Sequence, residues 1–364
     1  MSDPSYPAYP ILAFLASALV LVPLPWHLQA WNAGTCLYMI WTSISCFNLA
    51  LNSVLWHDNA INFAPVWCDI SSRVIVAMAV ALPAASLCIM RRLYKIASVQ
   101  IAGISYAEKR KAVMIDLSIG LGIPVLQIVM QYIVSGHRFD IFEDVGCFPF
   151  TYNTPVAYPL SLTWPLVIGL VTAIYCVLIL RAFFKRRVQF SEYLSLNSGL
   201  TANRYFRLMA LATVELFCTV PVAAYGLYLN IGLSQIQPWI SWSDTHFNYS
   251  QVDQYPAILW RMDRQTVIGM EMTRASPVIC AFIFFAFFGF ADEAHRNYRK
   301  AYHAVVGFLR LPTFKWRRSQ RSGSEVAGVL PVFQPMPYAP KPSPTTSSIE
   351  LKSSRPDSFD DVSY

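Results

Sequence analysis

Two pairs of opposite charges stand inside long apolar stretches of the sequence. Asp69 and Arg73 are four residues apart, and Glu271 and Arg274 are three apart. On a helix each pair would share one face and could neutralise itself. Charged groups in an apolar environment are costly and are usually functional or paired. Two interpretations stay open. The four charged groups and the nearby Trp67 bind a ligand, or the charged groups form local structural pairs.

The eight cysteines divide into two sets. Six lie within apolar stretches, where cysteine behaves as a small hydrophobic residue. These six are Cys36, Cys46, Cys88, Cys176, Cys218 and Cys280. Only Cys68 and Cys147 fall at predicted extracellular edges of the apolar stretches, where thiols can oxidise.

None of the common soluble-enzyme motifs is present. The sequence has no GxGxxG, no Walker loop, no HExxH, no CxxC and no GxSxG. We therefore expect a protein that is not an enzyme, with no catalytic residues, no metal site and no cofactor.

The composition indicates a membrane protein. The chain is 55% hydrophobic and 13% charged, with a mean hydropathy of +0.40, which is too apolar for a soluble chain of this length. A net charge of +7 could suggest binding to nucleic acid. The cations lie between apolar stretches, however, so we expect no nucleic-acid partner.

Seven apolar stretches are long enough to cross a bilayer. About 20 residues at a rise of about 1.5 Å span the hydrocarbon core. The first stretch lacks the basic n-region of a cleaved signal peptide, so we count it as a span. The predicted fold is an all-α membrane protein, a seven-transmembrane helix bundle. Its spans are Ile11–Leu24, Gly34–Trp56, Trp67–Met90, Ile115–Val134, Pro159–Ala182, Leu208–Leu233 and Thr266–Phe290.

Basic residues concentrate in alternate loops. The loops at 91–114 and 181–207 are rich in Lys and Arg, whereas the opposite loops collect Asp and Glu. Because Lys and Arg accumulate on the cytoplasmic side, we predict an extracellular N-terminus and a cytoplasmic C-terminus in the plasma membrane. The triplet Asn248-Tyr249-Ser250 then lies in the last outer loop, where Asn248 is a predicted glycosylation site.

The chain after the seventh span divides into two parts. From Phe290 to Phe308, apolar residues recur at helical spacing with cations on the other face. This pattern is typical of a helix on the inner membrane surface, and a short solvated helix is the alternative. From about Pro312, Pro, Ser, Thr and mixed charge predict disorder. We therefore predict a membrane domain over residues 1–310 and a disordered cytoplasmic tail over 311–364.

A seven-helix bundle with an external N-terminus has few common uses. A retinal protein needs a lysine inside the last helix, but every lysine falls in a predicted inner loop or the tail. A transporter would be expected to show repeated halves with matching broken helices, and we see no such symmetry. The remaining use is a receptor that transmits an outside event to an inside partner.

Four runs of sequence carry a family resemblance. Three are Pro23-Leu-Pro-Trp-His, Ala64-Pro-Val-Trp-Cys-Asp-Ile, and Pro83-Ala-Ala-Ser-Leu-Cys-Ile followed by Arg91-Arg-Leu-Tyr. The most specific is Gly136-His-Arg-Phe-Asp-Ile-Phe-Glu-Asp-Val-Gly-Cys-Phe-Pro, followed by Thr151-Tyr-Asn-Thr-Pro. Together they resemble the fungal mating pheromone receptors of the a-factor receptor type, in their basidiomycete branch. The resemblance covers roughly residues 10 to 300.

The resemblance implies a class D G-protein-coupled receptor. Its ligand would be a small peptide pheromone, farnesylated and carboxymethylated at a C-terminal cysteine, and its partner a heterotrimeric G protein α subunit. The Asp/Glu-Arg-Tyr and Asn-Pro-x-x-Tyr signatures of rhodopsin-like receptors are absent, as in this family. Two alternatives stay open: an orphan pheromone-receptor-like paralogue outside the mating locus, and a seven-helix transporter of a small amphiphile. The cognate pheromone and any homo-oligomer are also left open.

Two hypotheses concern opposite ends of the bundle. A disulfide between Cys68 and Cys147 would tie the second outer loop over the bundle mouth, and two unpaired thiols are the alternative. At the inner end, Glu215 lies about two helical turns from Arg207. We predict that Glu215 pairs with a cation of another helix and holds an inactive arrangement, while Pro221 supplies a bend. A purely structural carboxyl is the alternative.

A basic inner surface is predicted where the third and fifth spans end. Its cations serve topology and attract anionic lipid headgroups, at about 1 kcal/mol each. The family resemblance adds contact with a Gα subunit, chiefly through Arg91, Arg92 and Tyr94. The residues of this surface are Arg91, Arg92, Tyr94, Lys95, Lys185, Arg186 and Arg187.

Overall fold

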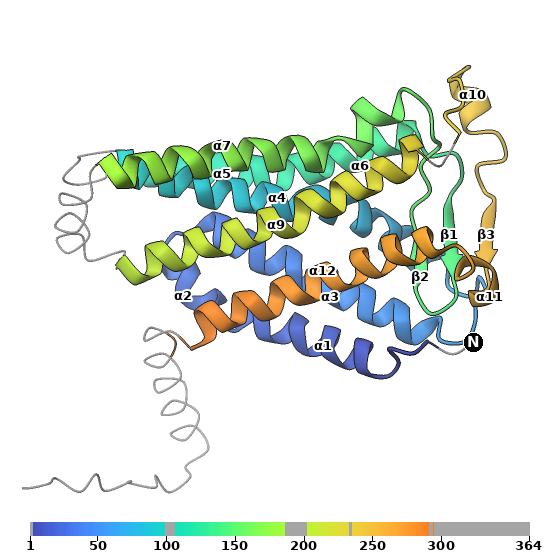
Figure 1. Cartoon of the computed structure of the whole chain (residues 1–364), viewed down its shortest axis with the longest axis horizontal. Helices are drawn as coiled ribbons and strands as arrows, with labels where there is room; N and C mark the ends of the chain where they lie inside the picture. The colour runs from blue at the N-terminus through green and yellow to red at the C-terminus, as the bar shows by residue number, and fades with distance from the viewer. Residues whose placement is uncertain (1–2, 99–105, 186–201, 233–234, 291–293, 295–364) are drawn as a thin grey trace, which may run out of the picture. The chain divides into compact units, whose positions relative to one another are not determined.

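A computed structural model describes residues 3–98, 106–185, 202–232, 235–290 and 294. In this part of the chain, seven helical segments are long and apolar enough to span a membrane, so the predicted bundle is confirmed (Figure 1). The predicted surface helix from 291 onward and the tail lie outside the described residues, apart from position 294. The seven segments are Ala8–Gln29, Ala33–Leu55, Pro65–Ala97, Tyr106–Ile133, Trp164–Ala182, Phe206–Gly232 and Arg264–Gly289.

The first three spans are built from four helices. α1 (Ala8–Leu21) and α2 (Leu24–Gln29) form the first span, with Pro23 preceding α2 as its N-cap. Because proline has no amide hydrogen, it fits at the start of a helix, where that hydrogen would have no intrahelical partner. The second span is α3 (Ala33–Leu55), and the third is α4 (Pro65–Ser98).

The fourth span contains a π-helical turn, and a second such turn precedes the fifth span. The fourth consists of α5 (Tyr106–Leu117), η1 (Ser118–Gly122) and α6 (Ile123–Ile133). The fifth lies in α7 (Trp164–Lys185), which follows η2 (Tyr158–Leu162). Such turns are common near functional sites.

The last two spans are α9 and α12. α9 (Ala202–Gly232) contains Pro221, and α12 (Arg264–Gly289) contains Pro277. Both prolines lie within continuous helices. The loop between these spans contains two short helices, α10 (Trp242–Thr245) and α11 (Ala257–Trp260).

α4 extends further than predicted. A loop was expected to begin at Arg91, but the helix continues to Ser98 and therefore includes the basic run from Arg91 to Lys95. That run contains no Gly or Pro and consists largely of good helix formers. Likewise α5 begins at Tyr106 and includes the cations at 109–111. The positive charges mark a membrane boundary, and they do not mark the ends of these helices.

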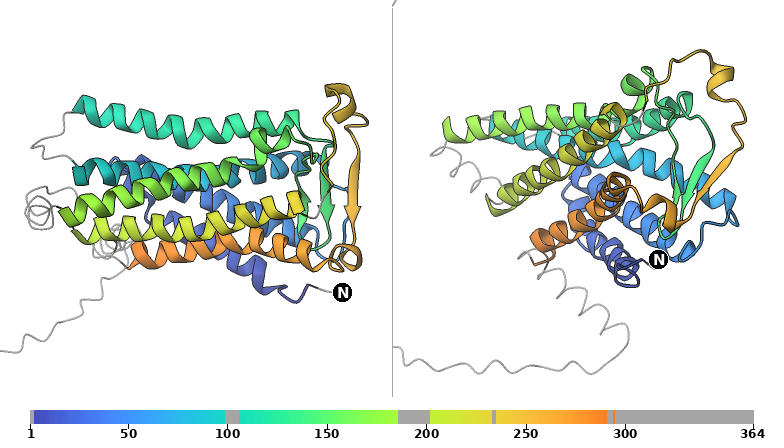
Figure 2. Two further views of the ribbon diagram at one scale, coloured as in Figure 1. Left: turned by 45° about the horizontal axis from the view of Figure 1, so that its top comes forward. Right: turned by 45° about the vertical axis from the view of Figure 1, so that its right-hand side comes forward.

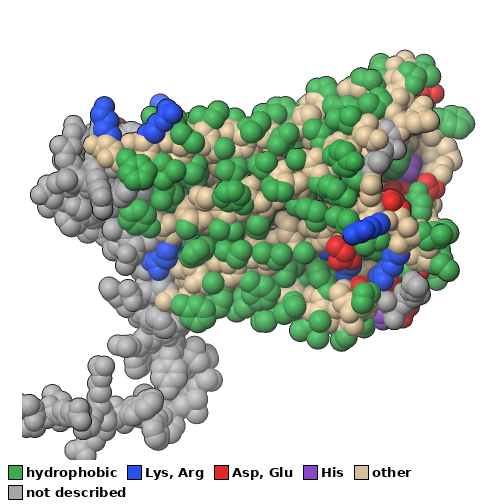
Figure 3. Space-filling model, viewed as in Figure 1, with side chains coloured by type: hydrophobic (Ala, Val, Ile, Leu, Met, Phe, Trp, Pro, Cys, Tyr) green, Lys and Arg blue, Asp and Glu red, His purple; other side chains and the backbone are tan. Residues whose placement is uncertain are grey.

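Many apolar side chains of the bundle point outward, and several polar side chains are buried. Val125, Ile174 and Phe217 are 60, 60 and 73% exposed, as suits a surface in contact with lipid acyl chains. Figure 3 shows hydrophobic side chains covering the middle of the bundle. Polar residues such as Thr42 and Asn48 of α3 are buried instead, which is the pattern expected when the solvent is lipid.

α4 is the central helix, with α3, α6, α7 and α9 packed against it. The principal apolar cluster includes Tyr38, Met90 and Phe284, and it extends from α1 to α12. This packing positions the start of α4, with Cys68, beneath the loops that close one end of the bundle.

A three-stranded sheet covers that end of the bundle, which is also where the described chain starts (Figures 1 and 2). β1 (Phe139–Phe142) pairs antiparallel with β2 (Gly146–Phe148) and parallel with β3 (Val252–Tyr255). β1 and β2 come from the loop before α7, and β3 comes from the loop before α12. We call this the sheet end, and the opposite end, with Lys95 and Lys185, the basic end.

Candidate functional site

A disulfide fastens the sheet to the bundle. Cys68 at the start of α4 and Cys147 in β2 are bonded, with their Cα atoms 5.1 Å apart. Both lie in a buried apolar cluster with Trp56, Phe139 and Ile141. The structure thus contains the pairing proposed from the sequence, and the bond holds the β1–β2 hairpin over the end of the bundle.

Asn52 of α3 is the polar centre beneath this hairpin. Its Nδ2 donates to Ser71 Oγ at 2.8 Å and to the Cys147 carbonyl at 3.4 Å, and its Oδ1 accepts from Trp67 Nε1 at 2.8 Å. Gly146 has φ +87°, and a Cβ there would lie 2.7 Å from the Asn52 Cβ, so the hairpin turn requires glycine. The indole nitrogen of Trp67 is therefore used to hold the α3–α4 junction.

Asp69 and Arg73 do not pair with each other, so the local-pairing interpretation does not hold for these two residues. Arg138 donates two hydrogen bonds to the Asp69 carboxylate, at 2.8 and 2.5 Å. Arg73 donates to Gln131 Oε1 and, at 2.8 Å, to the Tyr249 hydroxyl. Arg138 approaches Asp69 from a loop with two parallel hydrogen bonds, the geometry that makes an arginine–carboxylate pair strong. Arg73 consequently links α4 to α6 and to the loop that carries β3.

Glu271 and Arg274 do pair, at 2.9 Å, but Arg274 has a second and more buried partner. Asp3 Oδ2 lies 3.1 Å from Arg274 NH2, and both side chains are 2% exposed. Arg261 approaches Asp3 to 3.6 Å, and the Tyr9 ring centroid lies 4.2 Å from the Arg274 guanidinium. Asp3 is the only charged residue in the N-terminal segment. Its isolation there was the sequence feature that could have suggested a distant partner.

The pKa of Asp3 follows from these contacts. Burial alone would raise it, but hydrogen bonds from Ser5 and the charge of Arg274 together hold the pKa below its usual value. The Asp3 carboxylate is therefore ionised in the folded protein, and it anchors the N-terminal segment to α12.

The bundle encloses a cavity of about 410 Å³ beneath the sheet. Its walls come from α4, α6, α7, α9 and α12, and the β2 segment with Phe148 closes one side. None of the five candidate ligand-binding residues is among the side chains that line it. The polar lining is uncharged and consists of Gln127, Gln131, Thr151, Ser161, Thr219, Asn230, Thr273 and Ser276.

Asp69 and Arg73 border a second cavity, of about 370 Å³, at the outer face of α3, α4 and α6. Trp41, Ile70 and Ile128 contribute to an otherwise apolar lining. The charged candidates therefore do not line the 410 Å³ cavity, whose polar lining is neutral, and two of them, Asp69 and Arg73, line the second cavity instead. Sequence spacing could not reveal this, because it does not give the rotation of one helix relative to another.

An ion pair lies at the basic end. Arg91 NH2 is 2.5 Å from Asp116 Oδ1, and the Asp116 side chain is 3% exposed. Arg92 donates to the carbonyls of Trp31 and Ala30. Both arginines therefore hold α4 against neighbouring segments. The acidic residue inside the fourth predicted span was the signal for this pair, which the sequence analysis did not use.

The other predicted contact residues at this end differ in exposure. Tyr94 is partly buried, with its ring edge-on to Tyr175 at 5.7 Å. Lys95 and Lys185 are exposed. Arg186 and Arg187 lie outside the described residues, as does the side chain of Glu215. The hypothesis that Glu215 pairs with a cation therefore stays a prediction.

Asn248 is exposed and has φ 52° in the loop between α10 and β3. Its Nδ2 donates to Gln251 Oε1 at 3.1 Å. The neighbouring Tyr249 points inward to Arg73. The predicted acceptor for a glycan is therefore at the surface of the sheet end.

Comparison with known proteins identifies the family. A family model described as Pheromone A receptor matches residues 8–308, which include all seven spans. The Pheromone B alpha 3 receptor of Schizophyllum commune is 51% identical over 86% of this chain and 50% of its own length. Pheromone receptor 1 of Mycosarcoma maydis is 33% identical over 83% of this chain and 85% of its own length.

More distant similarity extends to yeast. The Pheromone a factor receptor of Saccharomyces cerevisiae is 24% identical over 82% of this chain. The chain spans about half the length of the Schizophyllum relatives it matches, 48 to 50% of each alpha receptor. The similarity covers the described bundle and its sheet, and on this evidence the chain belongs to the pheromone A receptor family.

Proposed function

We propose that this protein is a plasma-membrane receptor that binds an extracellular lipidated peptide pheromone and activates a heterotrimeric G protein. The observation that carries the proposal is the match of one pheromone receptor family model to residues 8–308, from the first span to beyond the last. A receptor of this kind needs a pheromone-binding site at one end and, at the other, a surface that contacts the G protein reversibly.

The sheet end would be extracellular. Three observations support this orientation: the disulfide, which requires an oxidising compartment, the exposed Asn248 acceptor, and the exposed Lys95 and Lys185 at the other end. The N-terminus would accordingly be outside, and the C-terminus inside.

The pheromone peptide would enter the cavity beneath the sheet. A volume of about 410 Å³ is within the range of small-ligand sites, and its neutral polar groups could bond to peptide amides. Gln127 Nε2 of α6 already donates a hydrogen bond to Ser161 Oγ of η2, at 2.9 Å. Asp69, Arg73, Glu271 and Arg274, if they contact the peptide, would do so at the rim.

The lipid of the pheromone would need a separate apolar slot. The second cavity has an almost entirely apolar lining and lies beside Ile70, which is 53% exposed. Its charged edge at Asp69 and Arg73 would then lie near the polar peptide. A prenyl chain could reach this slot from the membrane, because its burial there replaces contact with lipid acyl chains.

The basic end would contact the Gα subunit. Lys95 and Lys185 offer exposed cations to its surface. Arg91, held by Asp116, would act indirectly by fixing the end of α4. The proposed Gα contact therefore relies on Lys95 and Lys185, whereas the sequence analysis favoured Arg91, Arg92 and Tyr94.

GTP exchange on a Gα subunit reconstituted with the full chain tests the proposal. A panel of farnesylated peptides added from the sheet side should accelerate exchange, and the same peptides without the lipid should be much weaker. Uptake of labelled lipopeptide into vesicles, without any effect on exchange, would instead identify a transporter. No response to any lipopeptide in either assay would favour an orphan paralogue.

A further inference from the structure

Two clusters of histidine and aspartate occur at the sheet end. One consists of His137, Asp140 and Asp253, with the donor atoms of all three within 4.8 Å of one another. His137 Nε2 lies 2.6 Å from Asp140 Oδ1 and 4.0 Å from Asp253 Oδ2. His137 and Asp140 are buried, and the Asp253 side chain is 34% exposed. The cluster is therefore enclosed but reachable from solvent.

The two aspartates of this cluster face each other across strands. Asp140 of β1 is the register partner of Asp253 of β3 in the parallel pair. Like charges directly opposite each other destabilise a strand pair. Among the described residues, no Lys or Arg forms an ion pair with either carboxylate, and His137 is their nearest basic group. A cation between them would remove this repulsion.

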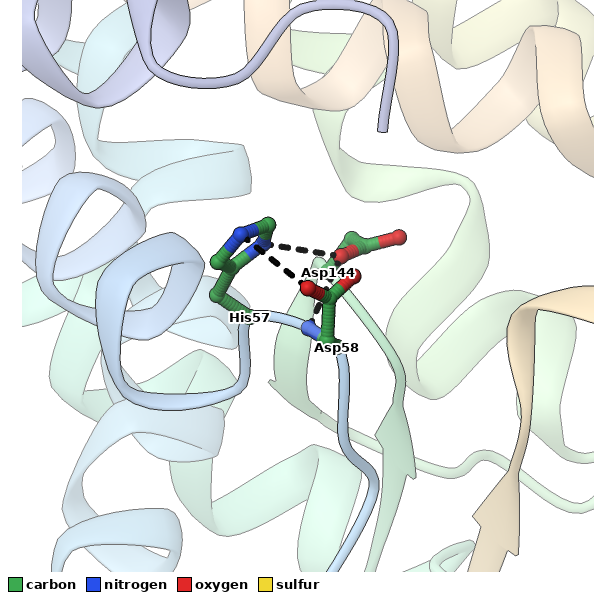
Figure 4. Close-up of side chains that lie close together, drawn as sticks. All are labelled: His57, Asp58 and Asp144. Carbon is green, nitrogen blue, oxygen red and sulfur yellow. Dashed lines mark hydrogen bonds and ion pairs between the residues drawn. The ribbon is translucent and has the colours of Figure 1, made fainter. Parts of the chain in front are cut away.

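The second cluster, of His57, Asp58 and Asp144, differs because an arginine already pairs with one of its carboxylates (Figure 4). Arg261 NH2 lies 3.0 Å from Asp144 Oδ2. Asp58 is 61% exposed, and its backbone amide donates to the Asp144 carboxylate. The guanidinium already neutralises the buried carboxylate, so this cluster serves as the internal comparison.

We propose that His137 Nε2 and the carboxylates of Asp140 and Asp253 bind a divalent transition-metal ion of the zinc type. Zinc accepts both imidazole nitrogen and carboxylate oxygen as ligands, and a site with three protein ligands leaves the fourth position to water. The imidazole ligand favours zinc over calcium or magnesium, which prefer oxygen. Zinc ligands lie about 2.0–2.2 Å from the ion, so donor atoms sit roughly 3.4 Å apart at tetrahedral angles. The observed separations of 2.6 and 4.0 Å bracket that value.

Metal binding would join the two loops that close the bundle. His137 and Asp140 belong to the loop before α7, whereas Asp253 belongs to the loop before α12. The ring of His137 stacks on Phe150, with centroids 3.9 Å apart, and both neighbours of Phe150 line the 410 Å³ cavity. The ion would therefore hold the cover of the cavity in place.

Zinc titration of the purified full chain in lipid nanodiscs tests the proposal, with binding followed by calorimetry. We expect one high-affinity ion per chain in the wild type. Asp253→Asn should raise the dissociation constant at least tenfold, because it removes a charged ligand while keeping its shape. His137→Gln should do the same, and His57→Gln, in the other cluster, should leave the affinity unchanged.

The variant Asp253→Asn keeps the test decisive if His137→Gln misfolds, because its side chain is partly exposed and lies in an outer strand. A zinc-dependent rise in Tm that is present in the wild type and lost in Asp253→Asn would support the site independently. The proposal is overturned if the wild type binds no stoichiometric zinc, if Asp253→Asn binds it as tightly as the wild type, or if only His57→Gln weakens binding.

Discussion

The buried pair between Asp3 and Arg274 allows a quantitative prediction. Asp3→Asn removes the charge but keeps the size of the side chain. Coulomb's law gives about 5 kcal/mol for opposite unit charges 3.1 Å apart at an effective dielectric constant of about 20. Loss of one partner from a buried pair costs about 3–5 kcal/mol, because the other charge is left uncompensated.

Arg274 retains one partner in this variant. Glu271 lies 2.9 Å from it, but its side chain is 44% exposed, so it offsets no more than about 1 kcal/mol. We therefore expect Asp3→Asn to destabilise the folded chain by about 3 kcal/mol, which lowers Tm by roughly 6–12 °C. Glu271→Gln is the matched control, since it removes the exposed partner of the same arginine, and it should cost less than about 1 kcal/mol.

Thermal unfolding of the wild type, of Asp3→Asn, of Arg274→Gln and of the double variant measures the coupling between Asp3 and Arg274. Because the pKa of Asp3 is lowered in the folded state, its stabilisation is present above the unfolded pKa of about 3.9 and is lost as pH falls through the folded pKa. The difference in Tm between the wild type and Asp3→Asn should thus be constant above about pH 5 and shrink below about pH 4. Equal Tm values for Asp3→Asn and the wild type at pH 7 would refute the reasoning.

Three further predictions concern other parts of the bundle. Cys68→Ser opens a disulfide that spans 79 residues and should cost about 4 kcal/mol, and a reductant should lower the wild-type Tm to the same value; a reductant without effect would contradict this. Gln131→Leu leaves Arg73 without its buried acceptor and should cost about 1–3 kcal/mol, seen as a lower Tm; a wild-type Tm would show that water replaces the amide. Lys95→Gln combined with Lys185→Gln should slow pheromone-stimulated GTP exchange several-fold while pheromone affinity stays the same, and an unchanged exchange rate would exclude these cations from the contact.

The pairing of Asp69 shows why part of the candidate site could not be predicted. Helical spacing correctly placed Asp69 and Arg73 on one face, but it could not show that Arg138 from another loop would offer two hydrogen bonds. Spacing did succeed for Glu271 and Arg274, and there too it missed Asp3, which is 271 residues away. A local pattern lists the partners within reach on one helix, whereas the partner chosen depends on segments that only tertiary folding brings near.

The sequence by itself determined the seven spans, the family and the two cysteines able to pair, because each depends on composition or on short local runs. The continuation of α4 beyond Arg91 also depends on local sequence, because that run contains no helix breaker. The positive charges of the run were instead taken to mark the end of the helix. Only the tertiary structure decided the neutral lining of the cavity, the burial of Asp3 and the alignment of Asp140 with Asp253. Those features depend on the rotation of helices and the register of strands, and both are set by packing between residues far apart in the chain.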